Sequence, residues 1–154
     1  MKKRIIISPW SKNTPKGQVC AKNYPFWPEL VELLNNKYDV IQIGRTPEEK
    51  IPNCSEYLFD KPLKDIKNLL FEVRDWISVD NFFHHFARFY KINGTVIFAK
   101  SDPAIFGHKH NNNLLKSKSF LRKDQFLYWN DEPLDKNSFL SAQEVYKSVI
   151  TFTG

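Results

Sequence analysis

The sequence of 154 residues has few cysteines and few glycines, and each shortage excludes a class of protein. Cys20 and Cys54 are too few for a disulfide framework, and neither lies in a Cys-x-x-Cys motif, so we expect two reduced thiols. The five glycines do not form a phosphate loop, because a Walker motif and the Gly-x-Gly-x-x-Gly fingerprint are both missing.

The chain also lacks a long hydrophobic run. No apolar stretch approaches the roughly 20 residues that a helix needs to cross a bilayer. The apolar run after the basic amino terminus, residues 5–7, is too short for a signal peptide and suits a first β-strand. We therefore expect a protein that has no membrane span and stays in the cytoplasm.

Aromatic and positively charged residues are plentiful. Phe, Trp and Tyr make up 15% of the chain, and the formal net charge is +6. The length fits one globular domain, residues 1–154, as do the 42% hydrophobic and 26% charged residues. The positive charge favours an anionic partner, such as a phosphate ligand, nucleic acid or an acidic membrane surface. A solubilising surface charge explains it equally well.

Strand and helix patterns alternate along the chain. Short apolar and β-branched runs typical of buried parallel strands occur at residues 4–7, 39–43, 56–59, 76–79 and 95–99. Helical apolar spacing follows Pro25 and Pro62, and Ser141 and Glu144 have the spacing of a capping box before a last helix. The alternation predicts an α/β fold, a Rossmann-like open parallel sheet with helices on both faces.

Two late segments have weaker patterns. Residues 108–118 are polar, and we expect a loop there. Residues 126–129 suit either an edge strand or an aromatic anchor.

Polar side chains follow three of the predicted strands. They are Ser8, Ser11 and Lys22 after the first strand, Asp80, Asn81 and His85 after the fourth, and Lys100, Ser101 and Asp102 after the fifth. In open parallel sheets ligands bind beyond the carboxyl ends of the strands. Hydroxyl, ammonium and helix-start N–H groups at this edge suit a phosphate-bearing ligand. The alternatives are a solvated loop, an N-cap at Asp80 and an Asx turn at Asp102.

The segment after Asp80 is expected to be a helix packed on the sheet. Its apolar residues at helical spacing are Phe82, Phe86, Phe89 and Tyr90. His84 and His85 are neighbours, so we expect one to face the site and the other to face solvent. His85, His108 and His110 are too loosely spaced to predict a metal site.

Several motifs follow one another in an order that resembles a known family. They are the strand and hydroxyl-rich loop at 5–9, Lys-Asn-Tyr-Pro at 22–25, the strand at 41–44 with Glu48 and Glu49 after it, Pro-Leu at 62–63, Asp-Asn-Phe-Phe-His-His-Phe-Ala at 80–87 and Phe-Ala-Lys-Ser-Asp-Pro at 98–103. Over residues 5–107 they resemble the carboxyl-terminal, donor-binding domain of family 9 glycosyltransferases, the ADP-heptose lipopolysaccharide heptosyltransferases. Tyr24 stands where that family has Trp, and Phe82 where it has the signature glycine. The resemblance implies half of a GT-B fold.

The resemblance also implies roles for the matched residues. Ser8, Ser11 and Lys22 would contact the diphosphate of a donor such as an ADP-sugar, Glu48 or Glu49 the ribose, and Asp80, Asn81 and His85 the diphosphate and the sugar. The implied reaction is sugar transfer to an acceptor hydroxyl. Cationic and backbone donors stabilise the departing diphosphate without a metal or another cofactor. No catalytic residue is assigned, because the family's amino-terminal acceptor domain supplies the general base.

We expect no counterpart of that acceptor domain within the 154 residues of this sequence. Three hypotheses follow. In the first, the chain is a nucleotide-sugar-binding domain that transfers sugar only with a partner, either a separate acceptor-domain subunit or a second copy. In the second, Phe82 has closed the pocket and the chain is a non-catalytic binding module for nucleic acid or protein. In the third, it is an accessory subunit that docks through exposed aromatic residues.

Overall fold

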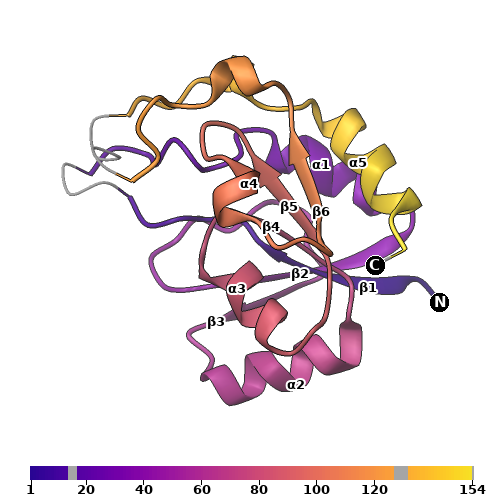
Figure 1. Cartoon of the computed structure of the whole chain (residues 1–154). Helices are drawn as coiled ribbons and strands as arrows, with labels where there is room; N and C mark the ends of the chain where they lie inside the picture. Colours follow the sequence, from indigo (N-terminus) through magenta and orange to yellow (C-terminus); the bar gives the residue numbers. More distant parts are fainter. Residues whose placement is uncertain (14–16, 127–131, 154) are drawn as a thin grey trace.

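The computed structural model describes residues 1–13, 17–126 and 132–153 of the chain. In this part the chain forms a six-stranded, fully parallel sheet with strand order β3-β2-β1-β4-β5-β6 (Figure 1). The strands are β1 (Lys3–Ser8), β2 (Tyr38–Gly44), β3 (Glu56–Phe59), β4 (Trp76–Val79), β5 (Thr95–Phe98) and β6 (Asn112–Leu115). The strand order reverses between β1 and β4, which is the topological switch point of a doubly wound sheet. The predicted Rossmann-like α/β fold is confirmed.

Helices cover both faces of the sheet (Figure 1). Helices α1 (Trp27–Leu34) and α5 (Ala142–Thr151) pack on one face, and α2 (Leu63–Val73) and α3 (Phe82–Phe89) pack on the other. Alternate residues of β1 enter the two layers: Ile5 and Ile7 join the α1 and α5 side, and Ile6 joins the α2 and α3 side. Burial on both faces explains why these strands are continuous apolar runs in the sequence.

The last helix begins with the predicted capping box. The Ser141 hydroxyl accepts a hydrogen bond from the Glu144 N–H (3.2 Å), and the Glu144 carboxylate accepts one from the Ser141 N–H (3.1 Å). Val145 and Val149 are buried against the core beside α1. Among the described residues, the structure has no helix with the length and apolarity that a membrane span requires.

The buried face of α3 differs from the one expected. Phe82 and Phe89 are 55% and 77% exposed, whereas Phe83, His84 and Ala87 are buried. Of the four aromatic residues predicted to pack on the sheet, Phe86 and Tyr90 are partly buried against the core. The fully covered stripe is the adjacent one, where the Phe83 ring packs edge-on against Trp76 with ring centroids 5.4 Å apart. Helical spacing identifies a stripe and does not determine which stripe the sheet covers.

The sheet also gains an edge strand where a loop was expected. Strand β6 lies within residues 108–118 and pairs with β5. Its Asn112 amide donates hydrogen bonds to Thr95 Oγ1 (3.2 Å) and Ser148 Oγ (2.8 Å), which fixes a polar residue on the sheet edge. A short helix, α4 (Pro103–Phe106), connects β5 to this strand. Of the segment expected as a strand or anchor, residues 127–129 lie outside the described residues, and the exposed Phe126 ring contacts Phe106.

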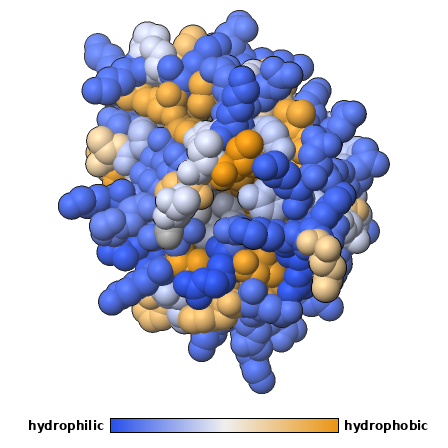
Figure 2. All heavy atoms as spheres, turned by 90° about the vertical axis from the view of Figure 1, so that its right-hand side faces the viewer, coloured by the Kyte–Doolittle hydropathy of each residue, from blue (hydrophilic) through white to orange (hydrophobic). Residues whose placement is uncertain are grey.

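The surface on the side of α1, α5 and the two termini is mainly hydrophilic. Figure 2 shows this side, with apolar residues gathered in small separate patches among charged and polar ones. Most of the large exposed apolar side chains lie on other elements, and they include Leu63 and Phe71 of α2 and Phe82 and Phe89 of α3. This side of the molecule therefore does not offer one broad apolar docking surface.

Gly94, just before β5, provides a test of the packing around β4. A Cβ atom added at Gly94 would overlap the indole ring of Trp76, which is held by a 3.1 Å hydrogen bond from its Nε1 to the Ile92 carbonyl. We predict that Gly94→Ala lowers the free energy of unfolding by about 1–3 kcal/mol, as overpacking does in a filled core. Urea denaturation measures this change.

The control is a double-mutant cycle with Trp76→Leu. If steric overlap with the indole causes the loss, Gly94→Ala costs less in the Trp76→Leu background, with a coupling of about 0.5–3 kcal/mol. Equal costs in the two backgrounds would contradict this explanation.

Candidate functional site

The carboxyl ends of β1 and β4 lie side by side because Ser8 is in register with Ser78. The Asn81 side chain joins the loops that leave these strands. Its amide nitrogen donates to the Ser8 carbonyl (3.1 Å), the Ser8 hydroxyl (3.0 Å) and the Trp10 carbonyl (3.3 Å). Its carbonyl oxygen accepts from the Phe83 N–H (2.9 Å) and caps α3. The N-cap is therefore Asn81, and the alternative that placed it at Asp80 is wrong.

Asp80 is a buried carboxylate with a partner at each oxygen. It is 6% exposed. Its Oδ1 lies 3.0 Å from Nε2 of the fully buried His84, and its Oδ2 lies 3.2 Å from the Lys22 ammonium in an ion pair. Burial by itself would raise the pKa of Asp80, but the hydrogen bond to His84 and the charge of Lys22 outweigh it and hold the pKa below its usual range. The structure thus brings the predicted residues Lys22 and Asp80 into contact.

Ser11 and Asn23 position the loop that carries Lys22. The Ser11 hydroxyl donates to the Asp80 carbonyl (2.8 Å), and the Ser11 N–H donates to the Asn23 side chain (2.6 Å). Asn23 in turn donates to the Ser11 carbonyl (3.3 Å) and is buried. Asn23 was not predicted as a site residue, although it lies inside the Lys-Asn-Tyr-Pro motif. The Lys22 ammonium also lies 5.8 Å from the centroid of the Phe106 ring.

His84, His85 and His108 form a group that sequence reasoning did not predict. The ring centroids of His84 and His85 are 3.9 Å apart, and His85 Nδ1 lies 2.7 Å from His108 Nε2. As expected, His84 is buried against Asp80 and His85 is exposed, but their rings lie close enough to form one group, and His110 is exposed and outside it. Burial and the nearby imidazoles lower the pKa of both His85 and His108.

The residues that follow β5 mainly support the structure. Lys100 donates to Glu132 Oε1 (2.8 Å) and to the Pro133 carbonyl (3.0 Å). Asp102 caps α4 by accepting from the Ala104 N–H (2.8 Å), as the turn interpretation expects. Ser101 is buried, and its hydroxyl helps to lower the pKa of Asp80. Of these three predicted residues, Ser101 is the one that joins the Asp80 group.

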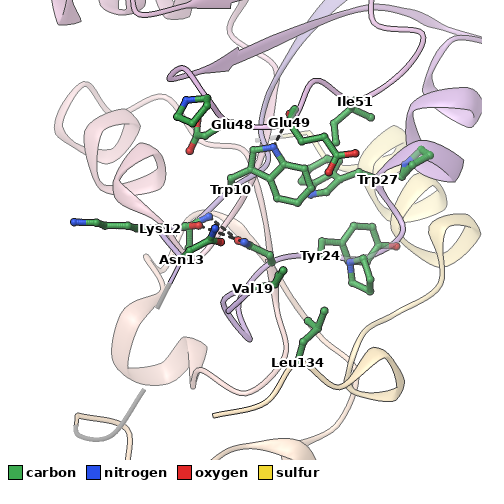
Figure 3. Close-up of a pocket in the computed structure, with 15 residues that line it drawn as sticks. Trp10, Lys12, Asn13, Val19, Tyr24, Trp27, Glu48, Glu49, Ile51 and Leu134 are labelled. Atoms are coloured by element: carbon green, nitrogen blue, oxygen red, sulfur yellow. Dashed lines mark hydrogen bonds between the residues drawn. The ribbon is translucent and has the colours of Figure 1, made fainter. Parts of the chain in front are cut away.

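A cavity of about 660 Å³ opens beyond the carboxyl ends of β1 and β2 (Figure 3). Apolar rings and aliphatic side chains line it, together with a few polar groups. The lining residues include Trp10, Ser11, Lys12, Asn13, Val19, Asn23, Tyr24, Trp27, Glu48, Glu49, Ile51 and Leu134. The Trp10 indole donates to the Glu49 carbonyl (2.8 Å), and the Glu48 carboxylate accepts from the Arg45 N–H (2.6 Å). Figure 3 shows Lys12 extending away from the Trp10 and Tyr24 rings.

The cavity and the Asp80 group are neighbours. Ser11 and Asn23 line the cavity, and the same Ser11 hydroxyl binds the Asp80 carbonyl. Lys22, whose side chain is 24% exposed, precedes the lining residue Asn23 in the chain. The arrangement is a cavity lined mainly by apolar side chains next to a group that contains a cation, a carboxylate and hydroxyl groups.

Phe82, which stands at the signature glycine, does not lie between Lys22 and Asp80. These two side chains are in direct contact. The Phe82 ring is more than half exposed and contacts the Phe83 and Phe86 rings, at centroid distances of 6.1 and 6.3 Å. The premise that Phe82 closes the pocket therefore finds no support in the structure.

The structure resembles solved heptosyltransferases. E. coli ADP-heptose lps heptosyltransferase II matches with a TM-score of 0.67 at 15% identity, over 97% of this chain and 46% of that protein. E. coli heptosyltransferase WaaC, solved with ADP, matches with a TM-score of 0.65 at 16% identity, over 95% of this chain and 43% of that protein. A third match is the dodecameric iron-containing heptosyltransferase TibC of enterotoxigenic E. coli, solved with ADP-D-β-D-heptose. Its TM-score is 0.62 at 19% identity, over 92% of this chain and 36% of that protein.

At these identities the likeness shows the fold, and it confirms the predicted resemblance to half of a GT-B heptosyltransferase. The chain spans less than half the length of these proteins. No family model matches the sequence, and the comparison with curated proteins found no match.

Asn81 offers a test of how the β1 and β4 loops are held together. We predict that Asn81→Ala lowers the free energy of unfolding by about 2–3 kcal/mol, because it removes a helix cap and leaves carbonyl groups of the β1 loop without a donor. Urea denaturation followed by circular dichroism measures the loss.

Asp102→Ala is the matched control for this variant. Asp102 caps α4 through the Ala104 N–H in the same way, but its carboxylate bonds to no second loop within the described part of the chain. We expect this change to cost about 1 kcal/mol or less. An Asn81→Ala cost no larger than that of the control would mean that the bonds between the loops contribute little.

Proposed function

We propose that the chain is the donor-binding domain of a glycosyltransferase and binds a nucleoside diphosphate sugar at the carboxyl edge of β1 and β4. The observation that carries this proposal is the contact of Lys22 with Asp80 beside the cavity, with Ser11 shared between the two. Three segments that are distant in the sequence meet there. Their meeting is what a site for a diphosphate requires.

The diphosphate is proposed to lie between Lys22, the Ser8 and Ser11 loop, and the amino-terminal end of α3. The Lys22 ammonium supplies positive charge, and Asp80 orients it from behind. The first N–H groups of α3 lie next to Asn81, and helix amino termini favour anions. His85 is exposed on the first turn of α3, where it can contact the sugar or its phosphate.

The nucleoside is proposed to occupy the cavity. Glu48 and Glu49 follow β2, the position from which acidic residues bind the ribose in doubly wound folds. The Trp10 indole is fixed by its hydrogen bond to the Glu49 carbonyl and offers a rigid aromatic wall. Aromatic walls with a few polar groups are typical of sites for ring-containing ligands.

Sugar transfer itself is proposed to need an acceptor-binding part outside these 154 residues. The solved proteins that the chain resembles are more than twice as long as the matched region. A separate subunit or a second copy of the chain could complete the cleft. We also keep the cytoplasm as the proposed location, in line with two free cysteines.

Nucleotide binding provides the direct test. We predict that ADP binds the chain in the presence of EDTA and that Lys22→Ala weakens binding about tenfold or more, because a charge-assisted hydrogen bond to phosphate is lost. Isothermal titration calorimetry with ADP and UDP measures both affinities. Lys22→Arg keeps the charge and the ion pair to Asp80, and it should recover most of the binding.

Lys147→Ala is the matched control, since Lys147 is exposed on α5 next to Ser148, which bonds the first residue of β6 at the opposite edge of the sheet. The affinity of this control variant for ADP should differ from that of the unchanged chain by about twofold or less. Absence of nucleotide binding, or equal losses in the Lys147 and Lys22 variants, would refute the proposed function. Salt-sensitive binding of nucleic acid in their place would support the binding-module alternative.

Catalysis provides a second test. We predict that these 154 residues alone, mixed with an ADP-sugar, release ADP no faster than buffer does, because no acceptor-binding part is present to supply a base and an acceptor. A coupled assay for free ADP measures the rate. ADP release that Lys22→Ala abolishes would show that the chain catalyses the reaction without a partner.

A further inference from the structure

His84, His85 and His108, called here the histidine cluster, place three imidazoles around one point beside the proposed donor site. One ring nitrogen of each histidine lies within 4.8 Å of those of the other two. Two of the residues come from the first turn of α3, and His108 comes from the loop after α4. The backbone of that loop is fixed, because the His108 carbonyl accepts from the Asn111 N–H (3.0 Å) and the Asn113 side chain (2.9 Å).

His84 has one ring nitrogen, Nδ1, that is buried and does not face Asp80. The residue is fully buried, and its Nε2 is engaged by Asp80 Oδ1 at 3.0 Å. When Nε2–H donates to the carboxylate, Nδ1 carries a lone pair. Nδ1 is buried and has no hydrogen-bond partner among the residues that the structure describes. An unpartnered buried polar atom of this kind costs stability and calls for an explanation, such as an ion.

The other two histidines complete the arrangement. His85 Nδ1 and His108 Nε2 lie 2.7 Å apart, and the rings are centred 4.9 Å from each other. Tetrahedral coordination with Zn–N bonds of about 2.0–2.1 Å separates the ligand nitrogens by about 3.3 Å. The His85–His108 separation is shorter than that value, and the ligand atom of His84 lies within 4.8 Å of the other two. Small rotations of His85, which is exposed, and of the partly exposed His108 would bring the three nitrogens to it.

We propose that the histidine cluster binds a divalent transition metal of the zinc type through His84 Nδ1, His85 Nδ1 and His108 Nε2. Metal-bound histidines usually donate their other ring N–H to a carboxylate, which fixes their tautomer. The Asp80 carboxylate is positioned to do this for His84. Three neutral nitrogen ligands suit Zn²⁺ and leave a fourth position open. The loose spacing of His85, His108 and His110 in the sequence predicted no metal site, and the structure places His84 in the group instead of His110.

The metal site does not depend on the proposed nucleotide site, although Asp80 belongs to both. Metal binding is measured without nucleotide, and nucleotide binding is measured with EDTA, so each can fail alone. Lys22 and Arg88 are the cations whose charge reaches the histidine cluster, and they act against a bound cation. The Asp80 carboxylate offsets part of this charge.

The test is a titration of the full 154-residue chain with Zn²⁺ by calorimetry and with Co²⁺ by absorption spectroscopy. We expect one ion per chain and visible Co²⁺ bands of a tetrahedral site, without the near-ultraviolet thiolate band that Cys20 or Cys54 would produce. His108→Gln should weaken Zn²⁺ affinity about tenfold or more, because one of three protein ligands is lost. His108 lies in a loop, so the variant can be checked for an unchanged circular dichroism spectrum.

His110→Gln is the matched control, two residues along the chain and outside the histidine cluster. It should change Zn²⁺ affinity about twofold or less. Asp80→Asn should lower affinity about 10–100-fold while keeping one ion per chain, as loss of an outer-shell partner does. The proposal is overturned if Zn²⁺ does not bind, if the two histidine variants behave alike, or if Co²⁺ shows a thiolate band.

Discussion

The buried Asp80 carboxylate is the group on which the rest of the site depends. Its removal from water is costly unless both oxygens have partners, and the structure provides His84 for one and Lys22 for the other. Its backbone carbonyl accepts a third contact, from the Ser11 hydroxyl. One residue thus joins the loop after β1, the end of β4 and the first turn of α3. Any ligand at this edge meets groups that Asp80 has already positioned.

The strand order of the sheet brings the loops around Asp80 together. Because β1 lies between β2 and β4, the loops that follow β1 and β4 leave the sheet together and diverge toward opposite faces. Asn81 spans the opening between them with three donated hydrogen bonds. The loop after β2 closes the other side through the Trp10 to Glu49 bond. This topology therefore leaves the cavity next to the group around Asp80.

The proposed functions use different properties of one constellation. Lys22 offers charge to an anion, whereas the histidine cluster offers lone pairs to a cation, and Asp80 stabilises both from between them. A carboxylate whose pKa is held low stays ionised near neutral pH, which both roles need. The likeness to solved heptosyltransferases agrees with the fold on which this constellation is built.

The sequence by itself determined five of the six described strands, most helices, the α5 cap and the edge at which polar residues gather. These follow from local patterns: apolar runs that need burial on two faces, and the Ser141 and Glu144 spacing. Only the tertiary structure decided that α3 buries Phe83 and exposes Phe82, that residues 112–115 pair as β6, and that His108 reaches His84. The physical reason is that such contacts depend on how segments distant in the chain are placed. Helical spacing and composition contain no information on that placement.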